Sequence, residues 1–517
     1  MQSSGATWRA RSVVARVVAS LIVPALVSAG CADDDQTAFP TSTTTTTVPD
    51  GSPQELLDHH DDWVLPGRDY DNSRATFDAE IDSRSAPRLT QAWAAELKGP
   101  LSTVPIVVGE VVYLQDGTGT ITVLHRDDGT VKWSSKPYGF NIGPFGVAVA
   151  NGRVFGVSSK AVVALDAETG GELWAREITA TPSGGVGIQP TVFDDMVLAS
   201  TVPVSIGGIY QGGDRGVLHA LDAATGDVRW TFDTVDSPDV WGNPEVNSGG
   251  GAWYPPSVDP ARGLVYWGVA NPAPFPGTAE YPNGSSRPGP NLYTESTVAL
   301  DIDTGELRWY HQAIPHDLFD RDMVHTLIAR PPGDGEVVIG TGKGGIVVGI
   351  DPESGEPLWR TEVGDHENDQ LTALDGPTMV TPGTYGGVLT PPATAEGIVY
   401  AAVINAPAKL KPDETAYFGA EFDQADGEVV AIDARTGKVV WDVDVPGDPL
   451  GSVTVVNDLV LTALFDGTVL ALDRETGEEV WRTEAAGGIN GWMAVVDDTI
   501  YVPVGHADPP QLVAYRL

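Results

Sequence analysis

Cysteine is almost absent from this chain, and basic residues are scarce. The 517 residues contain one cysteine, Cys31, which leaves no intrachain disulfide and no Cys-x-x-Cys-His site for covalent haem. Lys and Arg number 30 against 71 Asp and Glu, which gives a net charge of -41. Nucleic-acid binding needs clustered Lys and Arg, so this balance argues against it and indicates a well-hydrated surface.

The cysteine follows a secretory-type leader. Three arginines between residues 9 and 16 precede an apolar stretch, residues 17–27, that is too short to be a confident spanning helix. Ser28-Ala29-Gly30-Cys31 resembles a bacterial lipobox. We expect residues 1–30 to be a lipoprotein-type signal peptide and Cys31 to be lipidated. The alternative is an ordinary cleaved signal in which the cysteine is incidental.

The next segment, residues 31–61, is acidic and rich in threonine, and it cannot bury a core. We predict that it is a disordered tether. Together with the leader, it places the rest of the chain outside the cytoplasm. The expected location is the periplasmic or cell-surface side of a membrane, to which Cys31 anchors the protein.

A nine-residue phrase recurs along the remaining chain. Its form is Asp-x-x-Thr/Ser-Gly-x-x-x-Trp, and six copies match it, from Asp166–Trp174 to Asp473–Trp481. A seventh, degenerate copy ends at Trp133. An alternating apolar run precedes each copy, as in a half-buried strand, and the Asp and Gly favour a tight turn before the returning strand. A hairpin repeated with one large aromatic per copy is typical of a β-propeller.

The spacing of the repeats predicts a closed ring of eight blades. Trp93 has the same strand context without the turn, and the shortest step between these tryptophans is 40 residues, which is one four-stranded blade. Only 36 residues follow Trp481, enough for three strands. We therefore expect the strand of Trp93 to complete the last blade and hide both sheet edges. Residues 62–517 should form one all-β domain, with long loops at the larger steps.

These repeats resemble those of the pyrroloquinoline-quinone (PQQ) proteins, the eight-bladed quinoprotein alcohol dehydrogenase family. The resemblance spans roughly residues 62–517. Asp62-Trp63 and the phrase GRDYDNSR at residues 67–74 are similar to the opening of that family. The resemblance implies an extracytoplasmic dehydrogenase that uses PQQ and calcium or a lanthanide.

Residues 249–275, GGGAWYPPSVDPARGLVYWGVANPAPF, resemble one active-site segment of the family. By this resemblance, Trp253 lies flat against the quinone, and Asn271 lends its side-chain oxygen to the metal. A planar cofactor needs an aromatic platform, and a hard cation needs oxygen ligands. The alternative is that Trp253 belongs to the core and Asn271 to a turn.

Residues 314–328, IPHDLFDRDMVHTLI, resemble the second segment, with Phe319 where the family has Trp. The resemblance makes Asp320 the catalytic base and a metal ligand, and Asp322 a further carboxylate for the metal. A carboxylate beside a cation stays ionised and can accept a hydroxyl proton. Lys343 falls where the family contacts the quinone oxygens. Its alternative is a solvated charge in a turn.

Three departures from the family accompany these matches. The loop at residues 200–215 contains no Glu for the family's glutamate ligand, so Gln211 or Asp214 would have to serve. The adjacent cysteine pair of many members cannot exist. Residues 386–390, GGVLT, replace a Gly-Gly-x-Asn-Trp phrase that supplies a polar contact and an aromatic roof.

Intact catalytic residues in an altered pocket leave several functions open. We favour a PQQ-dependent dehydrogenase that oxidises an alcohol, polyol or sugar hydroxyl and passes electrons to an external acceptor. One alternative is a non-catalytic propeller lipoprotein that acts as an assembly scaffold of the cell envelope, like the outer-membrane assembly factor that shares these repeats. Another is a propeller that binds sugars or polymers. Only the first has a reason to keep Asn271, Asp320, Asp322 and Lys343 together.

Overall fold

The computed structural model describes residues 57–517, apart from 140–142, 180, 204, 207–208, 334 and 416–424. These residues belong to one compact unit, Thr44–Leu517. The predicted signal peptide, the lipobox and most of the predicted tether lie outside the described residues. Within the described part, no helix has both the length and the apolar character needed to cross a membrane.

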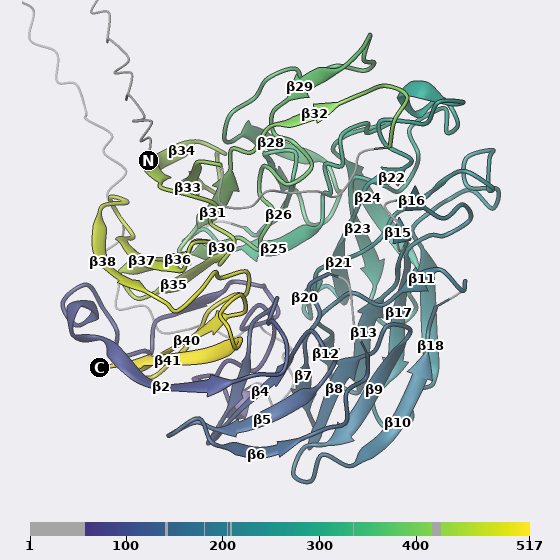
Figure 1. The fold of residues 1–517 in the computed structure, drawn as a ribbon. Helices are drawn as coiled ribbons and strands as arrows, with labels where there is room; N and C mark the ends of the chain where they lie inside the picture. The colour runs from purple at the N-terminus through teal and green to yellow at the C-terminus, as the bar shows by residue number, and fades with distance from the viewer. Residues whose placement is uncertain are drawn as a thin grey trace, which may run out of the picture. The chain divides into compact units, whose positions relative to one another are not determined.

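Eight antiparallel four-stranded blades, one of which carries an extra parallel strand, form an eight-bladed β-propeller in this unit (Figure 1). The first four are β3–β6 (Ile106–Val108, Val111–Gln115, Ile121–His125, Val131–Ser134), β7–β10 (Ala148–Ala150, Arg153–Val157, Ala161–Asp166, Glu172–Glu177), β12, β13, β17 and β18 (Thr191–Phe193, Met196–Ser200, Val217–Asp222, Val228–Asp233), and β20, β21, β23 and β24 (Ser257–Asp259, Leu264–Val269, Ser296–Asp301, Leu307–Gln312). The other four are β25–β28 (His325–Ala329, Val337–Gly342, Ile346–Ile350, Pro357–Glu362), β30, β31, β33 and β34 (Ala393–Ala395, Ile398–Ile404, Gly427–Asp433, Val439–Val445), β35–β38 (Val453–Val456, Leu459–Ala463, Thr468–Asp473, Glu479–Glu484), and β39–β41 with β2 (Ala494–Val496, Thr499–Val504, Gln511–Arg516, Thr90–Glu96).

Shorter elements decorate the blades. β1 (Ala75–Thr76) runs parallel to β35. Four two-stranded pairs lie in the long loops: β11 with β14 (Gly184–Gly185, Val202–Pro203), β15 with β16 (Ser205–Ile206, Ile209–Tyr210), β19 with β22 (Ser248–Gly249, Pro272–Ala273), and β29 with β32 (Thr378–Val380, Ala408–Leu410). The described residues also include two short 3₁₀ helices, η1 (Ala86–Arg88) and η2 (Pro282–Gly284).

The ring closes as the sequence predicts. Strand β2 pairs with β41, so that Trp93 lies opposite Ala514 in the last blade. In Figure 1 the dark N-terminal strand β2 lies against the yellow C-terminal strands β40 and β41. The prediction of an eight-bladed ring closed by the strand of Trp93 is confirmed, and both chain ends of the ring are paired rather than left as free edges.

The repeated phrase joins neighbouring blades. In the copy at Asp166, the carboxylate accepts a hydrogen bond from the Thr169 N–H at 2.8 Å, which fixes the turn. Gly170 then has φ +71°, and a Cβ added there would lie 2.7 Å from Trp133 of the preceding blade. The Trp133 indole donates to the Ala167 carbonyl at 3.0 Å. The tryptophans therefore hold the blades together, as the repeat predicts.

The segment at residues 62–76 crosses between blades. Trp63 pairs with Val107 of the first blade, and the Asn72 side chain donates to the Thr326 carbonyl of the fifth. Farther along, the buried Arg74 guanidinium donates to the Val453 carbonyl of the seventh blade at 2.9 Å. The segment thus ties together strands that are far apart in the sequence.

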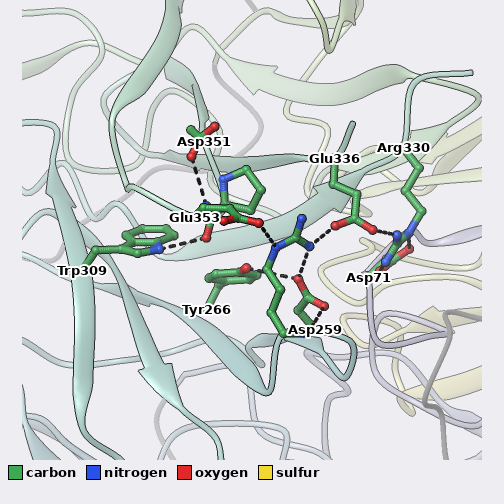
Figure 2. A network of polar contacts seen from close by, with 10 residues as sticks. Asp71, Asp259, Tyr266, Trp309, Arg330, Glu336, Asp351 and Glu353 are labelled. Atoms are coloured by element: carbon green, nitrogen blue, oxygen red, sulfur yellow. Dashed lines mark hydrogen bonds and ion pairs between the residues drawn. The ribbon is translucent and has the colours of Figure 1, made fainter. Parts of the chain in front are cut away.

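An ion-pair network fastens the same segment to the fourth and fifth blades (Figure 2). Arg330 binds both carboxylate oxygens of Asp71, at 2.6 and 2.9 Å, and also pairs with Glu336. Glu336 pairs in turn with Arg262, which lies 2.7 Å from Asp259. A two-pronged Arg–carboxylate pair sets geometry as well as energy, so this network fixes where the segment lies.

Strand β25 contacts this segment and directly follows the loop that carries Asp320 and Asp322. The N–H of Ile328, near the end of β25, donates to the Asp71 carbonyl at 2.9 Å. Asp320 and Asp322 come just before the strand begins at His325. Asn72 also reaches the Thr326 carbonyl near the start of the same strand, so the crossing segment lies along the inner strand that follows these aspartates.

Candidate active site

Loops of the fourth and fifth blades bring the predicted site residues together. Asp320 and Asp322 lie between β24 and β25, and Lys343 lies in the turn between β26 and β27. His325 at the start of β25 pairs with Thr341 near the end of β26. This register places the aspartates and the lysine at the same end of the sheet. Asn271 follows β21 of the neighbouring blade.

Lys343 is the centre of a buried ion cluster. Its ammonium nitrogen lies 2.7 Å from Asp320 Oδ2 and 2.5 Å from Asp322 Oδ2. Asp322 also accepts the backbone N–H of Asn271 through Oδ1, at 3.0 Å. All four residues are at least 92% buried. Four of the five predicted site residues are therefore joined by direct contacts, even though 72 positions separate the first from the last.

Burial and charge oppose each other in this cluster. Burial raises the pKa of the Asp320 carboxyl, and the Lys343 ammonium opposes that rise. Burial also pulls the pKa of Lys343 down, but the carboxylates of Asp320 and Asp322 outweigh it and hold the pKa well above its usual value. Lys343 is therefore a fixed positive charge that limits the rise, and the pKa of Asp320 remains raised, to about 8.

The turn that carries Lys343 needs glycine at two positions, Gly342 directly before it and Gly387 in a loop that packs against it. A Cβ on Gly342 would collide with the Asp322 carbonyl oxygen, and a Cβ on Gly387 would collide with the Lys343 carbonyl oxygen. Residues 386–390, which replace a polar and aromatic phrase of the resembled family, thus pack directly behind the lysine. The backbone comes close enough to hold the turn in place.

Trp253, the predicted platform, is partly buried. A Cβ on Gly143 would lie 2.6 Å from its Cε3 atom, so the indole packs on bare backbone. The next residue, Tyr254, donates from its hydroxyl to the Leu389 carbonyl at 2.7 Å. Burial raises the pKa of Tyr254, while the charges of Lys343 and Asp322 also act on it. Tyr254 thus links the Trp253 segment to the ion cluster.

The donor atoms fit the groups that the resemblance implies. Trp253 offers an aromatic face, and Lys343 offers a cation for quinone oxygens. Asp320, Asp322 and the amide oxygen of Asn271 are hard oxygen donors of the kind that calcium or a lanthanide takes. The Asn271 amide nitrogen donates to the Pro272 carbonyl at 3.2 Å, which leaves its oxygen available. Among the described residues, no three His, Cys, Asp or Glu side chains are grouped so as to hold a metal ion.

Asp214 lies in the loop at residues 200–215, which lacks the glutamate ligand of the resembled family. Asp214 is 1% exposed, and its Oδ1 atom accepts a hydrogen bond from Thr181. Its Oδ2 atom is buried without a partner among the described residues. The Asp214 carbonyl accepts the N–H of Gly249, whose strand pairs with the strand that follows Asn271. Asp214, one of the two substitutes that the sequence offers, is therefore tied to the strands beside the site.

Two carboxylates that hold the catalytic segment were missed by the sequence analysis. Asp317 accepts the N–H groups of Phe319 and Arg321, at 2.9 and 3.0 Å. Glu295 is fully buried and accepts the N–H groups of Asp322 and Met323. One signal was available: Glu295 is a charged residue directly before an apolar strand, a place where a carboxylate is costly unless it has a role.

Known proteins resemble two parts of this chain. Residues 181–373 match the family described as glucose/ethanol/alcohol dehydrogenase, beta-propeller domain, and residues 90–189 and 425–515 match outer membrane protein assembly factor BamB. The quinohemoprotein alcohol dehydrogenase ADH-IIG of Pseudomonas putida is 30% identical over 330 residues, which cover 57% of this chain and 45% of that protein. The polyvinylalcohol dehydrogenase of a Sphingopyxis species is 26% identical over 427 residues, covering 73% and 58%.

A solved structure of the Pseudomonas putida enzyme has the same fold. It superposes with a TM-score of 0.79 at 22% identity, and the matched region covers 91% of this chain and 83% of the solved chain. The chain spans about half the length of the curated relatives it matches. The first family match contains Trp253, Asn271, Asp320, Asp322 and Lys343. The chain is therefore similar, over part of its length, to the PQQ-dependent quinoprotein alcohol dehydrogenases, and it has their eight-bladed β-propeller fold.

Proposed function

We propose that this protein is a PQQ-dependent dehydrogenase that oxidises the hydroxyl group of an alcohol, polyol or sugar. The observation that carries the proposal is the buried contact of Asp320 with Lys343, within the segment that matches the dehydrogenase family. Relatives named as alcohol and polyvinylalcohol dehydrogenases support the substrate class.

Each residue has a role in this chemistry. Asp320 accepts the hydroxyl proton of the substrate, because burial raises its pKa to about 8 and makes the carboxylate a stronger base. Trp253 carries the planar cofactor, and Lys343 neutralises negative charge on its oxygens. PQQ, when bound, supplies the two-electron acceptor for the hydride that leaves the substrate carbon.

The same residues would hold a metal ion. Asn271, Asp320 and Asp322 would be its protein ligands, with Asp214 as a further candidate. Calcium or a lanthanide would polarise oxygens at the site. Electrons then pass to an external acceptor, since the single cysteine leaves no covalent haem site in this sequence.

A scaffold function is the second candidate, and a specific observation favours it. Two stretches, residues 90–189 and 425–515, match the assembly factor family. Both stretches lie outside the part of the chain that holds Trp253, Asn271, Asp320 and Lys343. A scaffold has no use for a buried lysine between two aspartates, which is why we prefer the enzyme.

Cofactor binding separates the two functions. The purified protein should be mixed with PQQ and calcium or lanthanum, and followed by the absorbance of the bound quinone. The enzyme predicts stoichiometric binding and alcohol-dependent reduction of an artificial electron acceptor. The scaffold predicts that PQQ elutes separately from the protein and that no alcohol reduces the acceptor.

We also propose that the protein is extracytoplasmic and anchored through a lipidated Cys31. The leader, the small residues before Cys31 and the Thr-rich segment support this location. Cys31→Ala should move the protein from the membrane fraction to the soluble fraction. A wild-type protein found entirely in the soluble extracellular fraction would contradict the anchor.

A further inference from the structure

The segment that carries Asp320 has an unusual backbone. Asp320 has φ +65° and Asp322 has φ +43°, so two residues in three take the left-handed conformation. Residues other than glycine adopt it at a cost of about 1 kcal/mol or more, and they keep it only when their surroundings impose it. Some contact must therefore hold this segment in shape.

Two buried carboxylates supply that contact from either side. Asp317 binds the N–H groups before and within the turn, on Phe319 and Arg321. Glu295 binds the next two, with Oε1 at 3.2 Å from the Asp322 nitrogen and Oε2 at 3.1 Å from the Met323 nitrogen. Four backbone donors around Asp320 are thus bound by side chains, and Glu295 holds those on the side of Asp322.

Glu295 is itself held in place. Its N–H donates to the Ala270 carbonyl at 3.3 Å, and its carbonyl accepts the Ala313 N–H at 2.9 Å. Ala270 directly precedes Asn271, so Glu295 connects the two segments from which Asn271 and Asp322 come. The side chain is fully buried. A fixed carboxylate at this junction can set the relative position of both segments.

The burial of Glu295 lowers the stability of the fold. Burial raises the pKa of the Glu295 carboxyl well above its usual value, and the neighbouring Asp317, Asp322 and Asp320 raise it further. Buried like charges destabilise a structure, and natural chains break such rules mainly where function requires it. A role in the architecture of the site explains why an acid stands here.

We propose that Glu295 is a positioning residue that holds the Asp320–Met323 turn in its left-handed conformation and thereby orients the Asp320 carboxylate toward the substrate hydroxyl. The inference rests on the proposed dehydrogenase function for its catalytic consequence. The contact between Glu295 and the turn does not depend on the dehydrogenase function, so the inference and the proposed function can fail separately.

The test compares Glu295→Gln with wild type. Glutamine keeps the size of the side chain but has one acceptor oxygen, so it can bind only one of the two N–H groups. Hydrogen exchange followed by mass spectrometry, on protein without added cofactor, should show about tenfold faster exchange confined to the peptide that covers residues 317–325. With PQQ and calcium or lanthanum, kcat should fall about tenfold or more while KM stays within about twofold, because misplacing a catalytic group costs rate rather than binding.

Glu306→Gln is the matched control. Glu306 lies in the turn that follows the same strand, β23, and its side chain is exposed. Unchanged exchange at residues 317–325 in Glu295→Gln overturns the inference, as does faster exchange spread over the whole chain. Faster local exchange with kcat equal to wild type also overturns it. Faster local exchange in a protein whose wild type neither binds PQQ nor oxidises alcohols supports the holding contact and contradicts the proposed function instead.

Discussion

The ammonium nitrogen of Lys343 lies 2.7 Å from Oδ2 of Asp320, and the same nitrogen lies 2.5 Å from Asp322. The side chains of Lys343, Asp320 and Asp322 are 10%, 2% and 7% exposed, so water screens the cluster weakly. The lysine therefore acts as an internal cation for two carboxylates that would otherwise attract an external one.

Removing this internal cation should strengthen metal binding. Lys343→Met keeps the unbranched side chain as far as Cε, and it leaves Asp320 and Asp322 without their counter-ion. We expect calcium or terbium to bind at least about tenfold more tightly at pH 8, because an uncompensated buried charge pair costs about 3–5 kcal/mol. Terbium luminescence sensitised by tryptophan measures this affinity.

Lys411→Met is the control for that experiment, since Lys411 forms an exposed pair with Glu414. The affinity of the Lys411→Met variant for terbium should equal that of wild type. Equal or weaker binding in Lys343→Met would show that the carboxylates and the lysine do not compete with a metal at one place.

The contact between repeat turns and tryptophans makes a prediction on stability. Gly170 and Gly152 have nearly the same backbone, with φ +71° and +69°, but a Cβ would meet Trp133 at 2.7 Å only at Gly170. Gly152→Ala should lower the free energy of unfolding by about 1 kcal/mol through backbone strain. Gly170→Ala should lower it by a further 1–3 kcal/mol or so, because the tryptophan must move. Equal losses in urea unfolding would mean that the blades do not depend on this packing.

A buried histidine predicts how stability changes with pH. His219 is 5% exposed, its Nδ1 atom has no partner among the described residues, and burial lowers its pKa to about 4. The unfolded chain therefore takes up a proton on His219 near pH 6.5, before the folded protein does. The stabilisation from neutral His219 is complete above pH 6.5 and is lost as pH falls toward 4.

His219→Gln should remove this contribution. Between pH 7.5 and 4.5, the free energy of unfolding should fall by about 2–3 kcal/mol less in the variant than in wild type. His125→Gln, at an exposed position, should follow wild type. If wild type and His219→Gln lose stability in parallel on acidification, His219 is not buried in its neutral form.

The fold was predictable because its signals are local. Asp166, Gly170 and the tryptophan that follows lie within nine residues, and each has a steric or hydrogen-bonding reason for its position. The partner of Trp93 could be predicted as well, because a sheet with three C-terminal strands needs a fourth. Local patterns repeated many times outweigh the long loops between them.

The site was predictable only in part, and the reason is physical. Asp320 and Lys343 could be picked out because whole segments resemble a family. Glu295 could be noticed only as a charged residue before an apolar strand, because its role arises from contacts with Asp322 and Met323, which lie 27 and 28 positions away on the next blade. No sequence periodicity records such a contact. The insertion of Lys343 between both aspartates likewise depends on strand register rather than on any motif.

The central claim is that Asp320 acts as the base in a PQQ-dependent oxidation, and Asp320→Asn tests it most directly. Asparagine keeps the shape of the side chain and the platform of Trp253 and Lys343, but it cannot accept the hydroxyl proton. In a parallel measurement of PQQ affinity and alcohol oxidation, PQQ should bind within a few-fold of wild type while kcat falls by about 10²–10⁴-fold. Turnover within about twofold of wild type, with PQQ bound, would contradict the account.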